Sequence, residues 1–276
     1  MNAAVRDRLG STGVWLPPQL LAATPVSAQR KAVARIEELG YGSVWTGEMP
    51  HGGREIMAQL AVLLGAGERI TVGAGIANIT RRDAESMATG AGTLAEAYPG
   101  RVILGLGGHR AVREMAAYLD AMPAEPPVTR VLGALGPRAL ELAGERTDGA
   151  HPFHMPVANT SRARAVLGPG PLLIPQLSFV LDDAVRAREA FRAMFAGVRG
   201  ESSYTRNLRR LGYTESDLAD GRSDRLIDDL LAHGDAPAVT ARVRDHLSAG
   251  ADHVLLTPLT SDLADAVEQL ARVAGA

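Results

Sequence analysis

The chain has 276 residues, of which 46% are hydrophobic and 22% charged, with a formal net charge of −2. This composition fits a single globular domain over residues 1–276 and gives no reason to expect nucleic acid or an anionic membrane as a partner. The absence of cysteine excludes disulfides and zinc–thiolate sites. No apolar stretch approaches the roughly 18 residues of a membrane helix, and residues 1–10 lack the apolar core of a signal peptide, so we expect a cytoplasmic protein.

Short apolar runs alternate along the chain with longer segments of helical periodicity. The runs predict strands at 14–16, 43–45, 70–76, 101–106, 128–133, 148–151, within 172–181 and at 253–257. The periodic segments predict helices at 26–39, 54–64, 83–98, 111–119, around 138–142, at 182–195 and at 262–273. Pro175 falls inside the seventh run and indicates an edge or a bulge there. Eight alternating units predict parallel strands with helical crossovers and favour a closed (β/α)8 TIM barrel over an open doubly wound sheet.

A polar segment at 201–233, rich in arginine and aspartate, interrupts this alternation before the last unit. It contains two short helical patterns. We interpret it as a helical insertion that serves as a lid or an interface, and Tyr204, Asn207 and Arg210 are its candidates for covering a site or a partner subunit.

Glycine-rich segments follow several of the predicted strands, where a barrel places its active site. They lie at 73–78, 105–110 and 133–137. Glycine lets the backbone approach a ring or a phosphate closely, and 133–137 leads directly into a helix, whose N-terminus attracts anions. These features predict a phosphate-bearing cofactor. The alternative is that the glycines only form corners of the barrel. The run 105–108 lacks the third glycine of a dinucleotide fingerprint, and no pair of histidines has metal-ligand spacing.

Several runs resemble the bacterial-luciferase-like monooxygenase superfamily. They are 40–48, 69–76 with Arg82 and Asp83, 93–107, 136–137, 143–150 and 249–254. Residues 162–171, 207–217 and 223–226 are similar to its F420-dependent oxidoreductase branch. Members are barrels that bind coenzyme F420 or FMN at the C-terminal ends of the strands, and they often form homodimers. The resemblance implies an F420-dependent enzyme that moves hydride between deazaflavin C5 and a small organic substrate.

The same resemblance implies which residues surround the cofactor. Gly75 and Ile76, next to Ala74, fall where relatives have a non-proline cis peptide behind the flavin ring. The ring is flanked by Gly107, Gly108 and His109. The cofactor's ribityl and phosphate groups are expected near Gly133, Ala134, Leu135 and Gly136.

Three residues are candidates for proton transfer, in the order His109, Glu48 and His51. Two of them have a structural alternative: His109 as a loop histidine bonded to backbone, and Glu48 as the partner of an arginine. Many relatives have histidine where this chain has Met49, and His51 lies two residues further along, so His51 is the weakest candidate. The loop after the fourth strand is also shorter than in close relatives.

The other histidines have weaker or structural roles, and two further functions are alternatives. His151 and His154 are weaker candidates for lining the pocket, whereas His233, His246 and His253 are expected to be structural. An FMN-dependent luciferase-like monooxygenase on the same barrel is the first alternative function. A non-catalytic F420-binding protein is the second.

Overall fold

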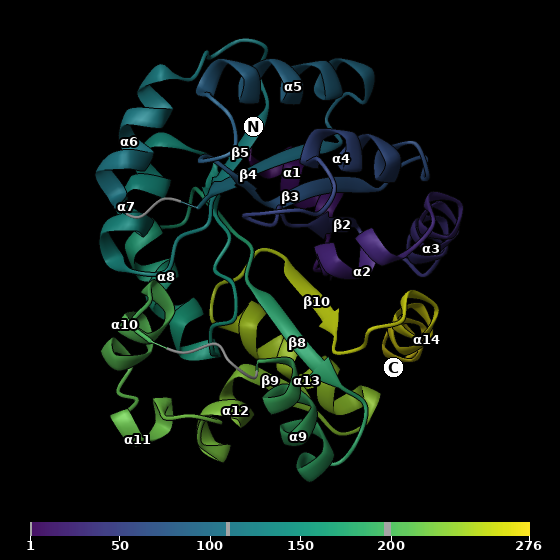
Figure 1. The fold of residues 1–276 in the computed structure, drawn as a ribbon, viewed down its shortest axis with the longest axis vertical. Helices are drawn as coiled ribbons and strands as arrows, with labels where there is room; N and C mark the ends of the chain where they lie inside the picture. Colours follow the sequence, from purple (N-terminus) through teal and green to yellow (C-terminus); the bar gives the residue numbers. More distant parts are fainter. Residues whose placement is uncertain (1, 109–110, 196–199) are drawn as a thin grey trace.

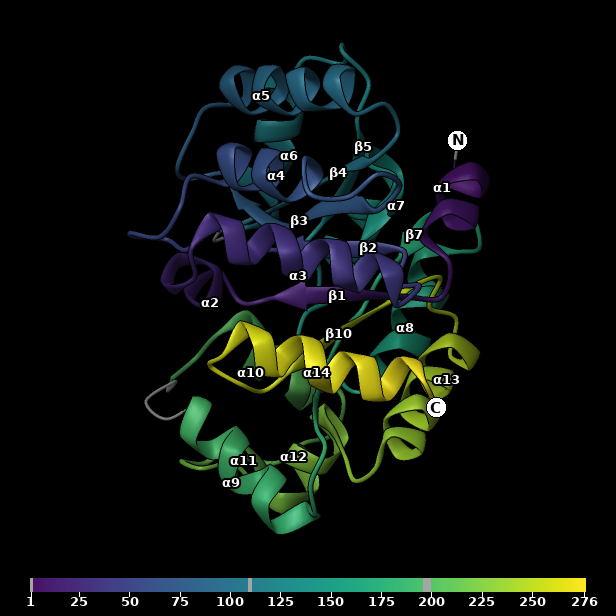
Figure 2. The same ribbon diagram turned by 90° about the vertical axis from the view of Figure 1, so that its right-hand side faces the viewer.

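The computed structural model describes residues 2–108, 111–195 and 200–276 and contains a parallel sheet of ten strands in the order β7-β6-β5-β4-β3-β2-β1-β10-β8-β9. The strands are β1 (Thr12–Leu16), β2 (Ser43–Thr46), β3 (Thr71–Asn78), β4 (Val102–Gly107), β5 (Thr129–Leu132), β6 (Gly149–Ala150), β7 (Leu172–Leu173), β8 (Gln176–Val180), β9 (Leu231–His233) and β10 (Val254–Pro258). The helices are α1 (Asn2–Leu9), α2 (Pro18–Ala23), α3 (Val26–Glu38), α4 (Ile56–Leu64), α5 (Ala84–Ala97), α6 (Val112–Ala121), α7 (Pro137–Arg146), α8 (Val157–Leu167), α9 (Ala184–Met194), α10 (Ser203–Arg210), α11 (Glu215–Leu218), α12 (Asp224–Leu230), α13 (Ala236–Ser248) and α14 (Leu263–Ala274). They surround the curled sheet, and α3 lies beside α14, near the C-terminus (Figures 1 and 2).

The segment that contains β7 and β8 closes the sheet into a barrel. On one side, Ile174 N donates to Ala150 O at 2.9 Å, and on the other, Leu255 N donates to Pro175 O at 2.9 Å. β7 pairs with β6, and β8 pairs with β10. Proline has no N–H for a ladder, which explains why the strand is interrupted at Pro175, as the sequence predicts. The predicted α/β barrel is confirmed.

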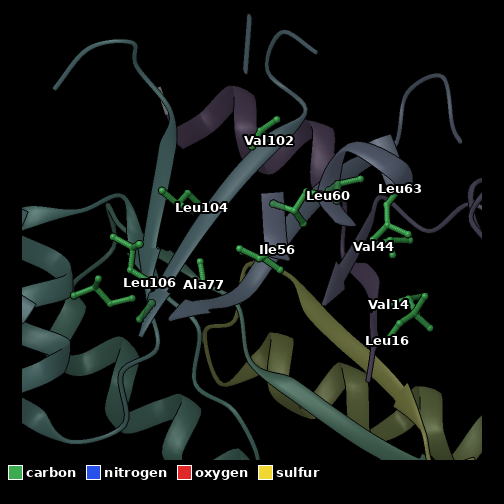
Figure 3. Close-up of a cluster of buried hydrophobic side chains, with 14 of the residues drawn as sticks. Val14, Leu16, Val44, Ile56, Leu60, Leu63, Ala77, Val102, Leu104 and Leu106 are labelled. Carbon is green, nitrogen blue, oxygen red and sulfur yellow. The ribbon is translucent and has the colours of Figure 1, made fainter. Parts of the chain in front are cut away.

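Side chains on the strands alternate between two cores. The outward-facing residues pack against the surrounding helices. Figure 3 shows Ile56 and Leu60 of α4 turned toward the outer face of the sheet, where Val44 lies. Because parallel strands carry helices on one face and the barrel interior on the other, most strand residues on both faces are buried, and most of these are apolar.

Two tryptophans fill much of the barrel interior, and glycines make room for them. A methyl group on Gly73 would lie 2.3 Å from the ring of Trp45, and one on Gly75 would lie 2.9 Å from Nε1 of Trp15. Trp45 is fully buried and Trp15 is 9% exposed. Several of the glycines in the segment at 73–78 therefore have a packing role, and the tryptophans belong to the core.

The insertion at 201–233 contains α10, α11 and α12 followed by β9, so the expectation of two short helices is corrected to three helices and a strand. β9 extends the sheet beside β8, with Phe179 opposite Ala232. Leu208, Leu226 and Leu230 form a second apolar cluster with Phe191 of α9. This cluster fixes the insertion against the barrel.

Helix α1 lies at the N-terminal end of the barrel strands and is held there by a shared carboxylate. Asp252 accepts a hydrogen bond from Arg6 Nε at 2.7 Å, from Arg164 Nη2 at 2.7 Å and from Leu173 N at 2.8 Å. Arg164 therefore has a structural partner at this end of the barrel. Among the described residues, no helix has the length and apolarity needed to cross a membrane.

Candidate cofactor and substrate site

The C-terminal ends of β3, β4 and β5 meet around the side chain of Ile76. The Gly75–Ile76 peptide bond is cis, as the resemblance implies, and the pairing with β4 shifts register between Ala74 and Ala77. A methyl group on Gly107 would lie 2.7 Å from Ile76 Cγ1, and one on Gly133 would lie 3.2 Å from Ile76 Cγ2. Both glycines thus accommodate Ile76, which forms a half-buried apolar floor at this end of the barrel.

Glu48 follows β2 and forms ion pairs with two arginines. Its Oε1 lies 2.6 Å from Arg82 Nη2 and 3.1 Å from Arg81 Nε, and its Oε2 lies 2.9 Å from Arg82 Nη1. Oε2 also accepts from Asn78 N at 2.8 Å, and the Glu48 side chain is fully buried. These hydrogen bonds raise the pKa of Arg82 further above its ordinary value. The carboxylate therefore ties the end of β2 to the loop after β3, beside Ile76, whose carbonyl accepts from Glu48 N at 2.9 Å.

The two histidine candidates for proton transfer follow the second and fourth strands in the sequence. His51 is exposed in the loop after β2, with no hydrogen bond from its side chain to any other described residue. His109 lies outside the described residues. Gly108, before it, has φ +84°, and a methyl group there would lie 2.0 Å from Asn78 Oδ1, so this position requires glycine.

The loop after β5 forms a corner with free backbone donors. Within the described part of the chain, the N–H groups of Ala134, Leu135 and Gly136 donate no hydrogen bond, and Gly136 is the N-cap of α7. A methyl group on Gly136 would lie 2.9 Å from Arg210 Nη1. The N-terminus of a helix attracts anions, and a guanidinium beside it adds a full positive charge.

Arg210 reaches this corner because α10 is tied to α8. Asn207 Nδ2 donates to Asn159 Oδ1 at 2.7 Å, and both amides are buried. Arg162 Nη1 donates to the carbonyl of Arg210. No carboxylate of the described residues pairs with Arg210. The insertion thus brings an unpaired cation to the start of α7.

His151 and His154 follow β6 and lie on an aromatic row that begins inside the barrel. His151 Nδ1 donates to Ile174 O at 2.7 Å, and burial lowers its pKa to about 4. His151 Nε2 is buried without a hydrogen-bond partner among the described residues. The row passes from Trp15 to Phe153, with centroids 4.7 Å apart, and from Phe153 to His154, 4.6 Å apart. The sequence predicted both histidines as candidates but not Phe153. Its position shortly after the sixth strand, where barrel active sites lie, could have indicated it.

Comparison with known proteins agrees with this geometry. The family model for luciferase-like monooxygenases matches residues 11–118, which include β1 to β4 and Glu48. This stretch of the chain is similar to that family, as the resemblance found in the sequence predicts. No curated protein sequence matches the chain.

Several solved structures align over almost the whole chain. An F420-dependent secondary alcohol dehydrogenase, in complex with an F420–acetone adduct, is 16% identical with a TM-score of 0.70, covering 95% of this chain and 97% of that chain. A coenzyme F420-dependent tetrahydromethanopterin reductase from Methanopyrus kandleri is 18% identical with a TM-score of 0.74 and the same coverage. The oxygenating constituent of 3,6-diketocamphane monooxygenase from Pseudomonas putida, in complex with FMN, is 14% identical with a TM-score of 0.65, covering 96% of each chain. At these identities the likeness establishes the shared fold alone.

Proposed function

We propose that this luciferase-like protein is an F420-dependent oxidoreductase that transfers hydride between the deazaflavin and a small organic substrate. The observation that carries the proposal is the corner at Gly136, where free N–H groups, the start of α7 and Arg210 converge. Two of the aligned structures are named for F420, and their TM-scores of 0.70 and 0.74 exceed the 0.65 of the FMN enzyme.

The residues around the barrel end suit a flat ring that carries a phosphate group. Ile76 offers an apolar surface for one ring face. The backbone N–H groups of residues 134–136 are available as donors beside Arg210 of α10. Ala74, Gly75, Gly107 and Gly108 belong to the same end of the barrel. F420 has a phosphate diester and a carboxylate-bearing tail, both of which suit a positively charged corner.

A bound deazaflavin would supply the hydride acceptor or donor at C5. The protein would bind the ring over Ile76 and hold the phosphate near Arg210. Glu48 would position the floor by holding Asn78 in place, because both of its oxygens are engaged. His109 is proposed to move the proton at the substrate, with His51 as the second candidate.

The cofactor assignment is tested by titrating the purified protein with F420 and with FMN while ligand fluorescence is followed. Tighter binding of F420 supports the proposal and selects reduced F420 for a substrate screen. Tighter binding of FMN moves the protein to the alternative, a luciferase-like monooxygenase, which consumes oxygen. F420 binding without turnover of any substrate supports the second alternative, a non-catalytic binding protein.

Arg210→Gln is expected to weaken F420 binding by about 10- to 100-fold, because a charge-assisted hydrogen bond contributes about 1.5–3 kcal/mol. The matched control is Arg206→Gln, on the same helix, because Arg206 lies 3.5 Å from Glu201 on an exposed surface. Fluorescence titration of both variants checks the prediction. Equal dissociation constants for the two variants would contradict the assignment of Arg210 to the phosphate.

A further inference from the structure

A cavity of about 260 Å³ lies between the insertion and α9, at the far end of the aromatic row. Its walls are mainly apolar and include Phe153, Phe191, Phe195 and Leu208. The ring of His154 stands edge-on to Phe153 and Phe195, with each pair of centroids 4.6 Å apart. The cavity is therefore an aromatic pocket with a histidine in its wall.

Two polar atoms in the wall of this cavity have no partner among the described residues. Arg222 Nη1 and His154 Nδ1 are buried, and neither forms a hydrogen bond with another described residue. Burial lowers the pKa of Arg222, which nevertheless stays charged at physiological pH. Burial, and then the positive charge of Arg222, lower the pKa of His154 to about 3, so the imidazole is neutral. A buried donor without a partner is unfavourable unless a ligand satisfies it.

The carboxylate nearest in sequence on α12 is already engaged by other arginines. Asp224 lies 2.8 Å from Arg188 Nη1 and 2.5 Å from Arg192 Nη2. Arg192 also holds the backbone of the turn, because its Nη2 donates to Arg222 O at 3.1 Å. Arg222 adopts φ +53°, a conformation unusual for a residue other than glycine. Its guanidinium forms no ion pair with a described carboxylate, although the turn that carries it is fixed from α9.

We propose that this cavity binds a small hydrophobic carboxylic acid, with the carboxylate on Arg222 and His154 and the apolar part among the phenylalanines. A guanidinium next to a neutral imidazole matches one carboxylate, which accepts from both. The aromatic walls favour an aryl or alkyl group over a sugar or a polyphosphate. The cavity is slightly smaller than the roughly 300–1,000 Å³ of pockets for drug-sized ligands, which suits a short acid.

In the proposed reaction, the cavity would hold the substrate or a part of it. Phe153 links it to Trp15, which donates from Nε1 to Gly75 O at 2.9 Å and so reaches the residues under the proposed cofactor ring. The acid would accordingly be the substrate or the part of it that gives specificity. This role rests on the proposed function, whereas binding of the acid does not.

Calorimetric titration of the full chain with 3-phenylpropanoate, without cofactor, tests the binding site. The amide of the same acid has the same size and no charge, and it is expected to bind about 10-fold or more weakly. Equal binding of acid and amide, or binding of neither, would overturn the proposal. This comparison uses the unaltered protein, so it does not depend on any variant folding.

Arg222→Met is expected to reduce binding of 3-phenylpropanoate by about 10- to 100-fold. The matched control is Arg225→Met, because Arg225 is exposed and lies 3.5 Å from Asp217, away from the cavity. An unchanged dissociation constant in Arg222→Met would overturn the assignment. F420 titration of the unaltered protein separates the two proposals: acid binding without F420 binding leaves the cavity standing alone, and F420 binding without acid binding leaves only the proposed function.

Discussion

Lowering the pH from 7 to 4 is expected to destabilise the protein severely, because three fully buried histidines must take up protons when the chain unfolds. Burial lowers the pKa values of His151, His246 and His253 to about 4 in the folded protein. In the unfolded chain the pKa of histidine is about 6.5. The stability that these groups contribute is fully present above pH 6.5 and is lost as the pH falls toward 4. Each histidine accounts for about 3 kcal/mol over this interval.

The surroundings of these histidines explain why protonation is unfavourable. His253 Nδ1 donates to Gly10 O at 2.9 Å, and its Nε2 lies 2.7 Å from Ser43 Oγ. His246 Nδ1 lies 2.8 Å from Thr160 Oγ1, and its Nε2 has no hydrogen-bond partner among the described residues. At His253 burial outweighs the neighbouring carboxylate of Asp252, which favours the charged form, and at His246 the positive charge of Arg242 adds to the effect of burial. The total loss is comparable with the roughly 5–15 kcal/mol by which folded domains are stable.

Denaturant titration at pH 7, 6, 5 and 4 measures this dependence. His246→Asn keeps a polar group at the position of Nδ1 and removes the titrating ring, so its unfolding free energy should change by about 3 kcal/mol less between pH 7 and 4. His51→Asn is the control, because His51 is exposed, and it should follow the unaltered protein. If His246→Asn shows the same pH dependence as the unaltered protein, proton uptake by His246 is not a cause of the acid instability.

The order of the barrel strands and of several helices could be predicted because apolar periodicity is local in the sequence, but no helix was predicted at α2, α8 or α13. The interruption at Pro175 was predicted for the same reason, since proline acts on its own strand. β9 was missed because Leu231 follows helix α12 without any polar or glycine break. α1 was missed because it has little amphipathic character, and its burial depends on Leu9 contacting the far end of the barrel.

Contacts between distant segments decided the parts of the site that the sequence did not predict. The glycines after the strands were expected to serve a cofactor, but Gly107 and Gly133 also pack against Ile76, a contact that only the bulge in β3 creates. The lack of a described partner for Nη1 of Arg222 cannot be inferred from spacing along the chain. The cavity at His154 depends on Phe191 of α9 meeting the insertion, which no local pattern indicates.

Removing Arg82 is expected to lower the free energy of unfolding by about 3–5 kcal/mol, because Arg82→Met leaves the buried carboxylate of Glu48 without its main partner. Arg82 makes two hydrogen bonds to Glu48, at 2.6 and 2.9 Å, and its side chain is 14% exposed. Arg81 remains at 3.1 Å but contacts only one oxygen. Denaturant unfolding at pH 7 measures the loss. Arg35→Met is the control, because the exposed pair of Arg35 with Glu38 contributes at most about 1 kcal/mol.

Substitutions of Glu48 distinguish its role as an ion-pair partner from a role in proton transfer. Adding Glu48→Leu to Arg82→Met removes the unpaired buried charge, so stability should recover by about 1–3 kcal/mol.

If Glu48 only positions Asn78 and Ile76, Glu48→Gln weakens F420 binding while the pH profile of turnover keeps its shape. If Glu48 transfers the proton, the variant binds F420 normally and loses one limb of that profile. Both of its carboxylate oxygens are already held by Arg82, which favours the first result.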